Sequence, residues 1–420
     1  MISWLIKNSL FIIIIFAWIL LSIIWGKTRR NRGSLRIYPL VVVYYSDFLK
    51  KLIRKVGFKY KKFWRNLGNV SEKIFIFALL IGTIYVILNV VALFSGAYFE
   101  FLGIPIGSQF IVVVPFITIP AGKLLVFIIF GFILALVFHE LFHGVVSVAE
   151  DVKIKSAGII ISLGVAGGFV EPNIEDELRA ILDNLEQKTI NEGGGRSASH
   201  QLAPRAKKIL RKYRRIVAAG IIANILLVSI FAGLLIGFGI IGAYEKYGLK
   251  ILKVEEGSPA DICGLRVGDI IVMIAEKRVR TLADFQEVLS ELSPGENVSF
   301  KVLRNNREVL IYVVLGEKNG RPYVGILIQQ YIRSNIPFLS DGAALDLHYF
   351  LYINALLEFL VVVINSLPIF FLDGSQWLNA SLIEKYGRRG LKIGTTINII
   401  ITLIFILNFI APTITSFLVQ

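Results

Sequence analysis

Cysteine and histidine are scarce in this sequence, and each scarcity narrows the possible chemistry. The single cysteine, Cys263, excludes an internal disulfide framework and a metal site built from several thiolates. Free cysteines are usually buried, so we expect Cys263 to be a packing residue. Only four histidines occur in 420 residues, so two histidines at a regular spacing are informative. Charged residues make up only 18% of the chain, which is low for a soluble protein of this length.

Apolar residues, by contrast, are abundant. They make up 55% of the chain, and the mean hydropathy of +0.70 predicts residence in a membrane. A helix needs about 20 apolar residues to cross a bilayer. Six stretches are long enough: Ile2–Trp25, Ile74–Phe94, Lys123–Val148, Ile216–Ala243, Leu347–Leu367 and Leu391–Leu418. The first has too long an apolar part for a signal peptide and lacks a cleavage site, so we expect a retained anchor.

The formal charge of +15 could suggest a nucleic-acid partner, but the basic residues cluster between apolar stretches. Gly26–Lys73, Asp151–Arg215 and the loop after Pro368 are rich in Lys and Arg, whereas Ser95–Ala121 contains neither. The positive-inside rule predicts that the first three are cytoplasmic and that both termini lie outside. We expect the basic segment Gly26–Lys73 to lie against anionic lipid. Contact with a regulator or nucleic acid is the alternative there, although no nucleic-acid partner is expected for the chain.

The loop Tyr244–Asp346 has the pattern of a folded domain outside the membrane, since loops of this length cross it regardless of charge. Its short apolar runs alternate with polar residues and are bounded by turns, which predicts strands. The run GSPADICGLRVGDIIVMI resembles the PDZ family, with Cys263 where a small residue is usual. PDZ domains hold a C-terminal carboxylate on loop amides beside a strand. We expect Gly248 and Leu249, in YGLKI, to form that loop; a domain that acts only as a steric gate is the alternative.

The chemistry points to FHELFH, Phe138 to His143. On a helix His139 and His143 lie at i and i+4, so both imidazoles project from one face and can share a metal ion. Glu140 lies about a quarter turn away, where it can act as general base on a water held at the metal. Such groups on a membrane-spanning helix are costly unless they are paired or ligated. The alternative is a helix end whose polar groups only face lipid headgroups.

A catalytic zinc ion needs a third protein ligand and an open position for water. His348 lies at the opposite end of its span and His200 in the cytoplasmic insertion, so neither matches the membrane depth of the HExxH motif. Asp373 follows Pro368 at the inner end of the fifth span, which does match. Proline ends or bends a helix, so the chain can turn Asp373 inward there. Taken alone, LDG is a common turn sequence, and an ordinary turn is the simpler interpretation.

Further motifs favour Asp373 as a zinc ligand over an ordinary turn. NSLPIFFLDG, Asn365 to Gly374, fits N-x-x-P-x-x-x-L-D-G. Together with HExxH, this motif resembles the site-2 protease family of intramembrane zinc metalloproteases. AAGIIAN, Ala218 to Asn224, and AGIIISLGVAGGFVEP, Ala157 to Pro172, are similar to two more features of the family, with Ile221 where the family often has Pro. The match covers most of the chain after Ala121.

These patterns and the resemblance together predict the fold class. We expect a polytopic α-helical membrane protein of about six spans, with a membrane-associated β-hairpin and an inserted extracytoplasmic PDZ-like α+β domain. Residues 1–121 would hold two N-terminal spans and a basic cytoplasmic loop. Residues 122–243 and 336–420 would form the two halves of the catalytic core, and 244–335 the PDZ-like domain.

The resemblance also implies roles. His139, His143 and Asp373 would bind one Zn²⁺, although two imidazoles and a carboxylate also suit iron. Glu140 would be the base, and Asn365 would hold the substrate carbonyl or its oxyanion, with helix–helix packing as the alternative. A structural role is the alternative for Asn224. The residues expected to contact substrate are Gly164, Gly167, Gly168, Asn224, Gly248 and Leu249.

The function implied is hydrolysis of peptide bonds in or near transmembrane segments of membrane proteins, in regulated signalling. The enzyme would reside in the cell membrane, in contact with lipid, with its active site near the cytoplasmic face. One alternative is a non-proteolytic scaffold or receptor that uses the PDZ-like domain and a structural metal. A zinc transporter would need polar residues through the full membrane thickness, and the spans show few away from the inner end.

Overall fold

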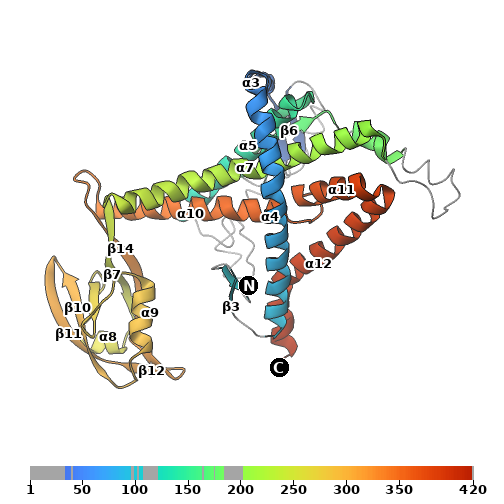
Figure 1. The fold of residues 1–420 in the computed structure, drawn as a ribbon. Coiled ribbons are helices and arrows are strands. Elements are labelled where there is room, and N and C mark those ends of the chain that lie inside the picture. The colour runs from blue at the N-terminus through green and yellow to red at the C-terminus, as the bar shows by residue number, and fades with distance from the viewer. Residues whose placement is uncertain are drawn as a thin grey trace. The chain divides into compact units, whose positions relative to one another are not determined.

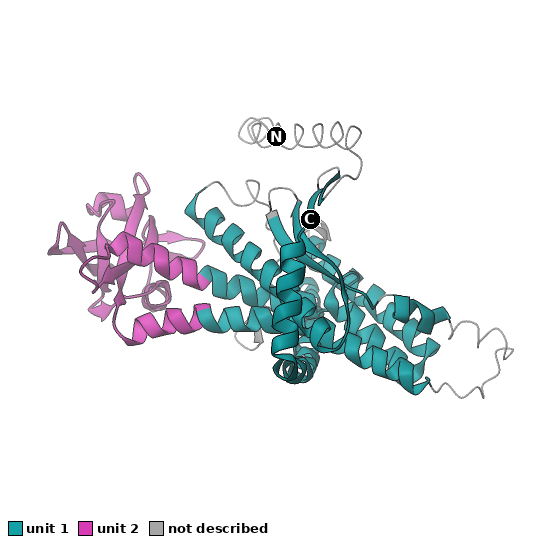
Figure 2. Ribbon diagram, turned by 90° about the horizontal axis from the view of Figure 1, so that it is seen from above, with its two compact units in different colours: residues 1–230, 353–420 teal, residues 231–352 magenta. Residues whose placement is uncertain are grey.

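The structure is a computed structural model (Figure 1). It describes residues 34–38, 41–95, 99–101, 104–106, 122–162, 165–174, 176–183 and 202–418. The first expected span, Ile2–Trp25, together with Gly164 and His200, lies outside the described residues. The chain divides into two compact units (Figure 2): residues 1–230 with 353–420, and residues 231–352.

Among the described residues, five helices are long and apolar enough to cross a membrane. They are α4 (Lys61–Ser95), α5 (Lys123–Ala149), α7 (Pro204–Ile240), α10 (Asp341–Ser366) and α12 (Arg388–Leu418). They correspond to the second to sixth expected spans. The helix α7 begins twelve residues before the expected apolar start at Ile216, because the Lys and Arg residues there are good helix formers. Large apolar side chains on these helices face outward, as lipid contact requires; Phe77 and Val126 are 67% and 63% exposed.

The helix α4 packs into the same unit as the predicted catalytic helices. Its Phe75 stacks on Trp377 of α11 (Asp373–Tyr386), with ring centroids 5.6 Å apart. Farther along, Asn89 donates through Nδ2 to Oδ1 of Asn408 in α12 at 2.7 Å, and both side chains are fully buried. The expected division at residue 121 is therefore not a boundary between packed units.

The expected hairpin is present as strands β5 (Ile154–Ser162) and β6 (Val165–Pro172). Two strands from the basic segment join it, β1 (Leu35–Tyr38) and β2 (Val41–Tyr45), and the antiparallel sheet has the order β1-β2-β5-β6. The sequence did not predict this pairing. Along the chain, the helix α3 (Asp47–Lys59) follows β2 directly. A short antiparallel pair, β3 (Phe99–Phe101) and β4 (Ile104–Ile106), comes between α4 and α5 in the sequence.

The strand β6 forms one edge of this sheet and packs against α5. The contact is close because two glycines face the helix. A Cβ atom on Gly167 would lie 3.0 Å from Cδ1 of Leu136, and one on Gly168 would lie 3.3 Å from Cα of Val137. These glycines therefore set how near the hairpin comes to the helix that carries HExxH.

The second unit contains the PDZ-like domain. Its elements are β7 (Tyr244–Val254), α8 (Pro259–Ile262), β8 (Ile270–Ile274), β9 (Lys277–Arg278), α9 (Leu282–Ser290), β10 (Asn297–Arg304), β11 (Arg307–Val314), β12 (Gly316–Lys318), β13 (Arg321–Tyr323) and β14 (Ile326–Ser334). The main sheet has the order β11-β10-β8-β7-β14, and β9 pairs with β8. Ile251, Ile271, Phe300 and Val313 are fully buried in its core. Cys263 packs half-buried against this core, which confirms the prediction of a packing residue.

The expected peptide loop at Gly248 and Leu249 is wrong. Both residues lie inside β7, which runs between β8 and β14, and Leu249 pairs with Ile271 on one side and Gln330 on the other. A strand with neighbours on both sides uses its N–H and C=O groups in the sheet. Leu249 is also fully buried. The strand begins at Tyr244, earlier than expected, and the edge next to β7 is formed by β14.

Candidate metal centre

The structure brings together the three predicted metal ligands. Nε2 of His139 lies 3.0 Å from Oδ2 of Asp373, and Nε2 of His143 lies 3.2 Å from the same oxygen. These ligand atoms all lie within 4.8 Å of one another. The side chains of His139, His143 and Asp373 are only 6%, 11% and 13% exposed. The prediction that Asp373 meets the HExxH histidines, 230 residues or more away along the chain, is therefore confirmed.

Hydrogen bonds behind the imidazoles determine which nitrogens face the cluster. Nδ1 of His139 lies 2.8 Å from Oδ1 of Asn224, and Nδ1 of His143 lies 2.7 Å from the carbonyl oxygen of Ile216. A carbonyl oxygen only accepts, so both Nδ1 atoms donate, and Nε2 is in each ring the nitrogen that can bind a metal ion. Metal-binding histidines are commonly oriented in this way by an outer hydrogen bond.

Gly220 leaves the space that an ion would need. A Cβ atom on Gly220 would lie 2.5 Å from Nε2 of His139 and 2.5 Å from Nε2 of His143. The backbone of α7 thus passes directly beside the ligand atoms, and a side chain there would fill the site. The donor set and this cradle fit a metal ion of the zinc type. Gly220 lies within the AAGIIAN motif, but no role was predicted for it.

Asp373 is the first residue of α11, and basic residues of α7 hold that helix in place. Arg214 lies 2.8 Å from Glu384 of α11 and 2.7 Å from Glu72 of α4. Tyr213 donates its hydroxyl to Oε1 of Gln376 at 2.5 Å. The Lys and Arg residues here were expected from membrane topology alone, whereas in the structure Arg214 also joins the helices around the cluster.

Glu140 lies between α5 and the hairpin. Its Oε2 accepts a hydrogen bond from the backbone N–H of Val170 in β6 at 3.1 Å, and its side chain is half-buried. It is not one of the three clustered ligands, as expected of a general base. The glycines Gly167 and Gly168 contact α5, and their contact with substrate stays a prediction.

Asn365 lies half-buried in the last turn of α10. Its role toward substrate stays a prediction. His348 belongs to the other unit, where its Nδ1 lies 3.2 Å from the hydroxyl of Tyr244. It is not a member of the cluster, as predicted from its depth.

Asn224 has a structural position, not the substrate contact expected for it. The residue is fully buried behind His139, and its Nδ2 donates to Oε2 of Glu358 at 2.7 Å and to the carbonyl oxygen of Ala135 at 3.2 Å. Glu358 was not among the residues predicted for the site. The available signal was a lone acidic residue in the middle of the span Leu347–Leu367, a position where charge is rarely tolerated without a partner.

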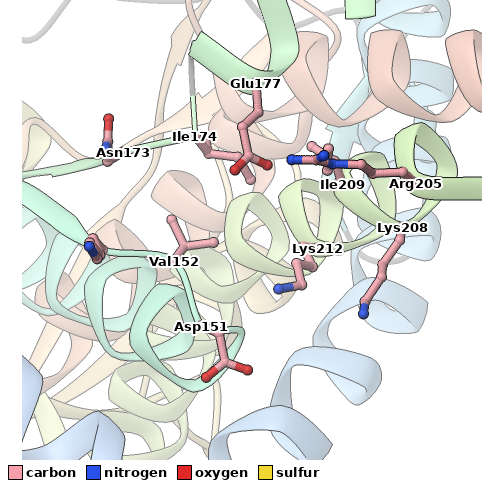
Figure 3. A pocket seen from close by; sticks show the side chains of 10 residues that line it. Asp151, Val152, Asn173, Ile174, Glu177, Arg205, Lys208, Ile209 and Lys212 are labelled. Carbon is pink, nitrogen blue, oxygen red and sulfur yellow. The ribbon is translucent and has the colours of Figure 1, made fainter.

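A separate polar pocket of about 450 Å³ lies beyond the end of α5 (Figure 3). It contains none of the predicted site residues. Its lining is Asp151, Val152, Lys153, Asn173, Ile174, Glu177, Arg205, Lys208, Ile209 and Lys212. Asp151 pairs with Lys61 and Arg65 of α4, and the hydrogen bond from Lys61, with the nearby Arg65 charge, lowers the pKa of its carboxyl group.

Comparison with known proteins identifies the family. The family model described as Peptidase family M50 matches residues 127–408, which include all three clustered ligands. The chain belongs to peptidase family M50. This confirms the predicted resemblance to the site-2 proteases. The chain is therefore a member of a metallopeptidase family, and the chain itself has several apolar helices.

Similar proteins match different shares of the chain. An uncharacterised protein of Methanocaldococcus jannaschii is 28% identical over 359 residues, covering 84% of this chain and 81% of that protein. The serine protease Do-like HtrA of Bacillus subtilis is 32% identical over 84 residues, which is 20% of this chain and 19% of that protease. The PDZ domain of an SdrC-like protein from Listeria innocua is 28% identical, covers 20% of this chain and 96% of that domain, and has a TM-score of 0.19.

Proposed function

We propose that this M50 peptidase is an intramembrane zinc metalloendopeptidase that hydrolyses peptide bonds in or near transmembrane segments. The observation that carries the proposal is the buried cluster of two Nε2 atoms and one carboxylate oxygen. Structural zinc sites are usually closed by four protein ligands. Among the described residues this cluster contains three, which favours a catalytic site over the structural metal of a scaffold.

His139, His143 and Asp373 would hold the ion. A bound zinc ion supplies Lewis-acid chemistry, which acidifies water and polarises a carbonyl group. The carboxylate of Glu140 accepts a proton from the attacking water and later delivers it to the leaving amide nitrogen. The N–H of Val170 holds Oε2 of Glu140 at the hairpin side of the site, so proton transfer would take place next to β6.

The hairpin suggests how substrate would bind. A transmembrane helix hides its peptide bonds, so the substrate must unwind before hydrolysis. The strand β6 forms the edge of its sheet and lies beside Glu140, so an unwound segment could add to it through main-chain hydrogen bonds. Gly167 and Gly168 belong to this strand, and Asn365 would then hold the carbonyl group of the bond to be cut.

We place the active site near the cytoplasmic face and the PDZ-like domain on the other side of the membrane, in line with the positive-inside rule. Regulated cleavage of signalling proteins is the process that this arrangement suits. A C-terminal peptide would bind at the β14 edge, not at Gly248. Gln330 of β14 donates to the carbonyl oxygen of Arg280, just before α9, so this edge lies next to that helix.

The experiment compares the wild type with Glu140→Gln on a single-span model substrate in bilayers, together with elemental analysis of bound metal. We expect both proteins to hold one zinc ion and only the wild type to cleave. Cleavage by the variant at the wild-type rate would refute the assignment of the base. Iron in place of zinc would correct the cofactor, and a metal-loaded wild type that cleaves no membrane substrate would favour the scaffold alternative.

A further inference from the structure

Glu358 is a carboxylate in the middle of α10 that takes no part in the proposed proton transfer. It is fully buried, and its Oε2 accepts from Nδ2 of Asn224 at 2.7 Å. The helices α7 and α10 run side by side in Figure 1, and this bond joins them. A buried acidic group in a membrane-spanning helix costs free energy, so its contact with Asn224 calls for a function.

The contacts of Asn224 fix which way its amide points. Nδ2 has two acceptors, Oε2 of Glu358 at 2.7 Å and the carbonyl oxygen of Ala135 at 3.2 Å. Because a backbone carbonyl can only accept, the NH₂ end of the amide faces these two oxygens. The carbonyl end, Oδ1, must then face His139, whose Nδ1 lies 2.8 Å away.

This orientation decides which nitrogen of His139 can bind metal. Since Oδ1 of Asn224 accepts, Nδ1 of His139 donates, and the lone pair is left on Nε2, beside Asp373. A reversed amide would present N–H groups to Nδ1 and shift the proton to Nε2, which could then no longer be a ligand. Two hydrogen bonds donated by Asn224 prevent this reversal, and the one to Glu358 is the shorter.

We propose that Glu358 is a positioning residue of the metal centre. It holds the Asn224 amide in the one orientation that keeps His139 as an Nε2 ligand, and so links α10 through α7 to α5. The proposal rests on metal binding by the cluster but not on proteolysis. Outer partners of metal ligands typically contribute about 10- to 100-fold to metal affinity, which sets the size of the expected effect.

The test measures the zinc dissociation constant of the full chain by competition with a chelator, and the absorption spectrum of the Co²⁺-loaded protein. Glu358→Met keeps the length of the side chain but removes the acceptor. We expect it to weaken zinc binding about 10- to 100-fold and to alter the Co²⁺ spectrum. Glu358→Gln retains a carbonyl oxygen for Nδ2 of Asn224, so it should restore both readouts to near the wild type.

The matched control is Asn89→Leu. It removes another fully buried hydrogen bond between spans, the 2.7 Å contact from Asn89 to Asn408 that joins α4 to α12. This variant should lower the melting temperature but leave zinc affinity and the Co²⁺ spectrum unchanged. If Glu358→Met and Asn89→Leu affect zinc affinity equally, Glu358 is only a packing residue and the proposal is wrong. The same conclusion follows if Glu358→Gln binds zinc as weakly as Glu358→Met does.

Asn224→Ala provides a second, independent measurement, which also serves if Glu358→Met does not fold. If Glu358 acts through Asn224, the alanine variant weakens zinc binding at least as much as loss of the Glu358 acceptor does. Adding Glu358→Met, which removes the acceptor, to Asn224→Ala then changes nothing further. A wild-type zinc affinity in Asn224→Ala would overturn the proposal, as would an additional loss in the double variant. Cleavage plays no part in these measurements, so they stand apart from the test of Glu140.

Discussion

Gly220→Ala should abolish tight metal binding through a single added methyl group. The new Cβ would lie 2.5 Å from Nε2 of both His139 and His143, whereas ordinary contacts begin at 3.4 Å. The imidazoles would have to retreat by about 3.4 − 2.5 = 0.9 Å. They are held from behind by Asn224 and Ile216, which lie on the same helix four residues after and four residues before Gly220.

The size of the effect follows from these two anchors. A retreat of 0.9 Å from α7 would lengthen the 2.8 Å and 2.7 Å bonds at Nδ1 beyond hydrogen-bonding range. Each bond contributes about 1 kcal/mol, so the two together amount to about 2 kcal/mol, or a loss of about 30-fold in zinc affinity. The methyl group also fills the space for the ion, so this value is a lower bound.

Chelator competition with the full chain in detergent measures this loss. Gly233→Ala is the matched control, because Gly233 lies on the same helix with nothing within 4 Å of an added Cβ. Both substitutions favour the helix by about 1 kcal/mol, so neither should unfold it. If Gly220→Ala binds zinc as tightly as Gly233→Ala, the ligand atoms do not converge beside α7 and the description of the metal centre is incorrect.

Three further predictions concern a ligand, an ion-pair network and a charged cap. Asp373→Ala should leave less than one zinc per chain after dialysis, and full retention would show that the carboxylate is not a ligand. Arg214→Met should cost about 3 kcal/mol in thermal unfolding because the largely buried carboxylate of Glu72 loses the Arg214 guanidinium and that of Glu384 keeps only Arg211. Arg211→Met, at a side chain that is 60% exposed, should cost under about 1 kcal/mol; equal losses would contradict the network. The carboxylate of Asp284 accepts hydrogen bonds from the backbone N–H groups of Arg280 and Thr281, and these bonds lower the pKa of Asp284 from 3.8. Asp284 therefore stabilises α9 fully above pH 3.8, and less as the pH falls through the lowered pKa. Hydrogen exchange in α9 should therefore be faster in Asp284→Asn than in the wild type at neutral pH, with a difference that disappears in acid; a constant difference would refute the sign.

The sequence predicted the metal centre well because the decisive spacing is local. Two histidines at i and i+4 share a helix face wherever that helix lies, and the Pro368–Asp373 segment marks a break at matching depth. The role of Gly220 and that of Glu358 were not predictable in this way. Each depends on which residue of another helix comes opposite, and that is decided by packing among α5, α7 and α10.

The sheets show a second limit of prediction from sequence. The runs LRIY and VVVYY are short and rich in strand-forming residues, but they stand in a segment whose Lys and Arg content favoured a lipid-facing loop. Their pairing with β5 is a long-range contact that local patterns do not specify. In the PDZ-like domain the resemblance located the domain correctly, whereas the start of β7 at Tyr244 placed Gly248 within a strand.

The buried amide pair of Asn89 and Asn408 has a practical consequence for dissecting this protein. The family match begins at residue 127, so a shortened chain that starts there would seem to keep the whole peptidase. Deleting α4 would remove the donor to Oδ1 of Asn408, whose Nδ2 would keep only the carbonyl oxygen of Ile404, and would uncover the Trp377 ring, which stacks on Phe75. An amide exposed to hydrocarbon without a partner costs several kcal/mol. We therefore expect a stable shortened chain to need α4, which lies upstream of the segment that the family model matches.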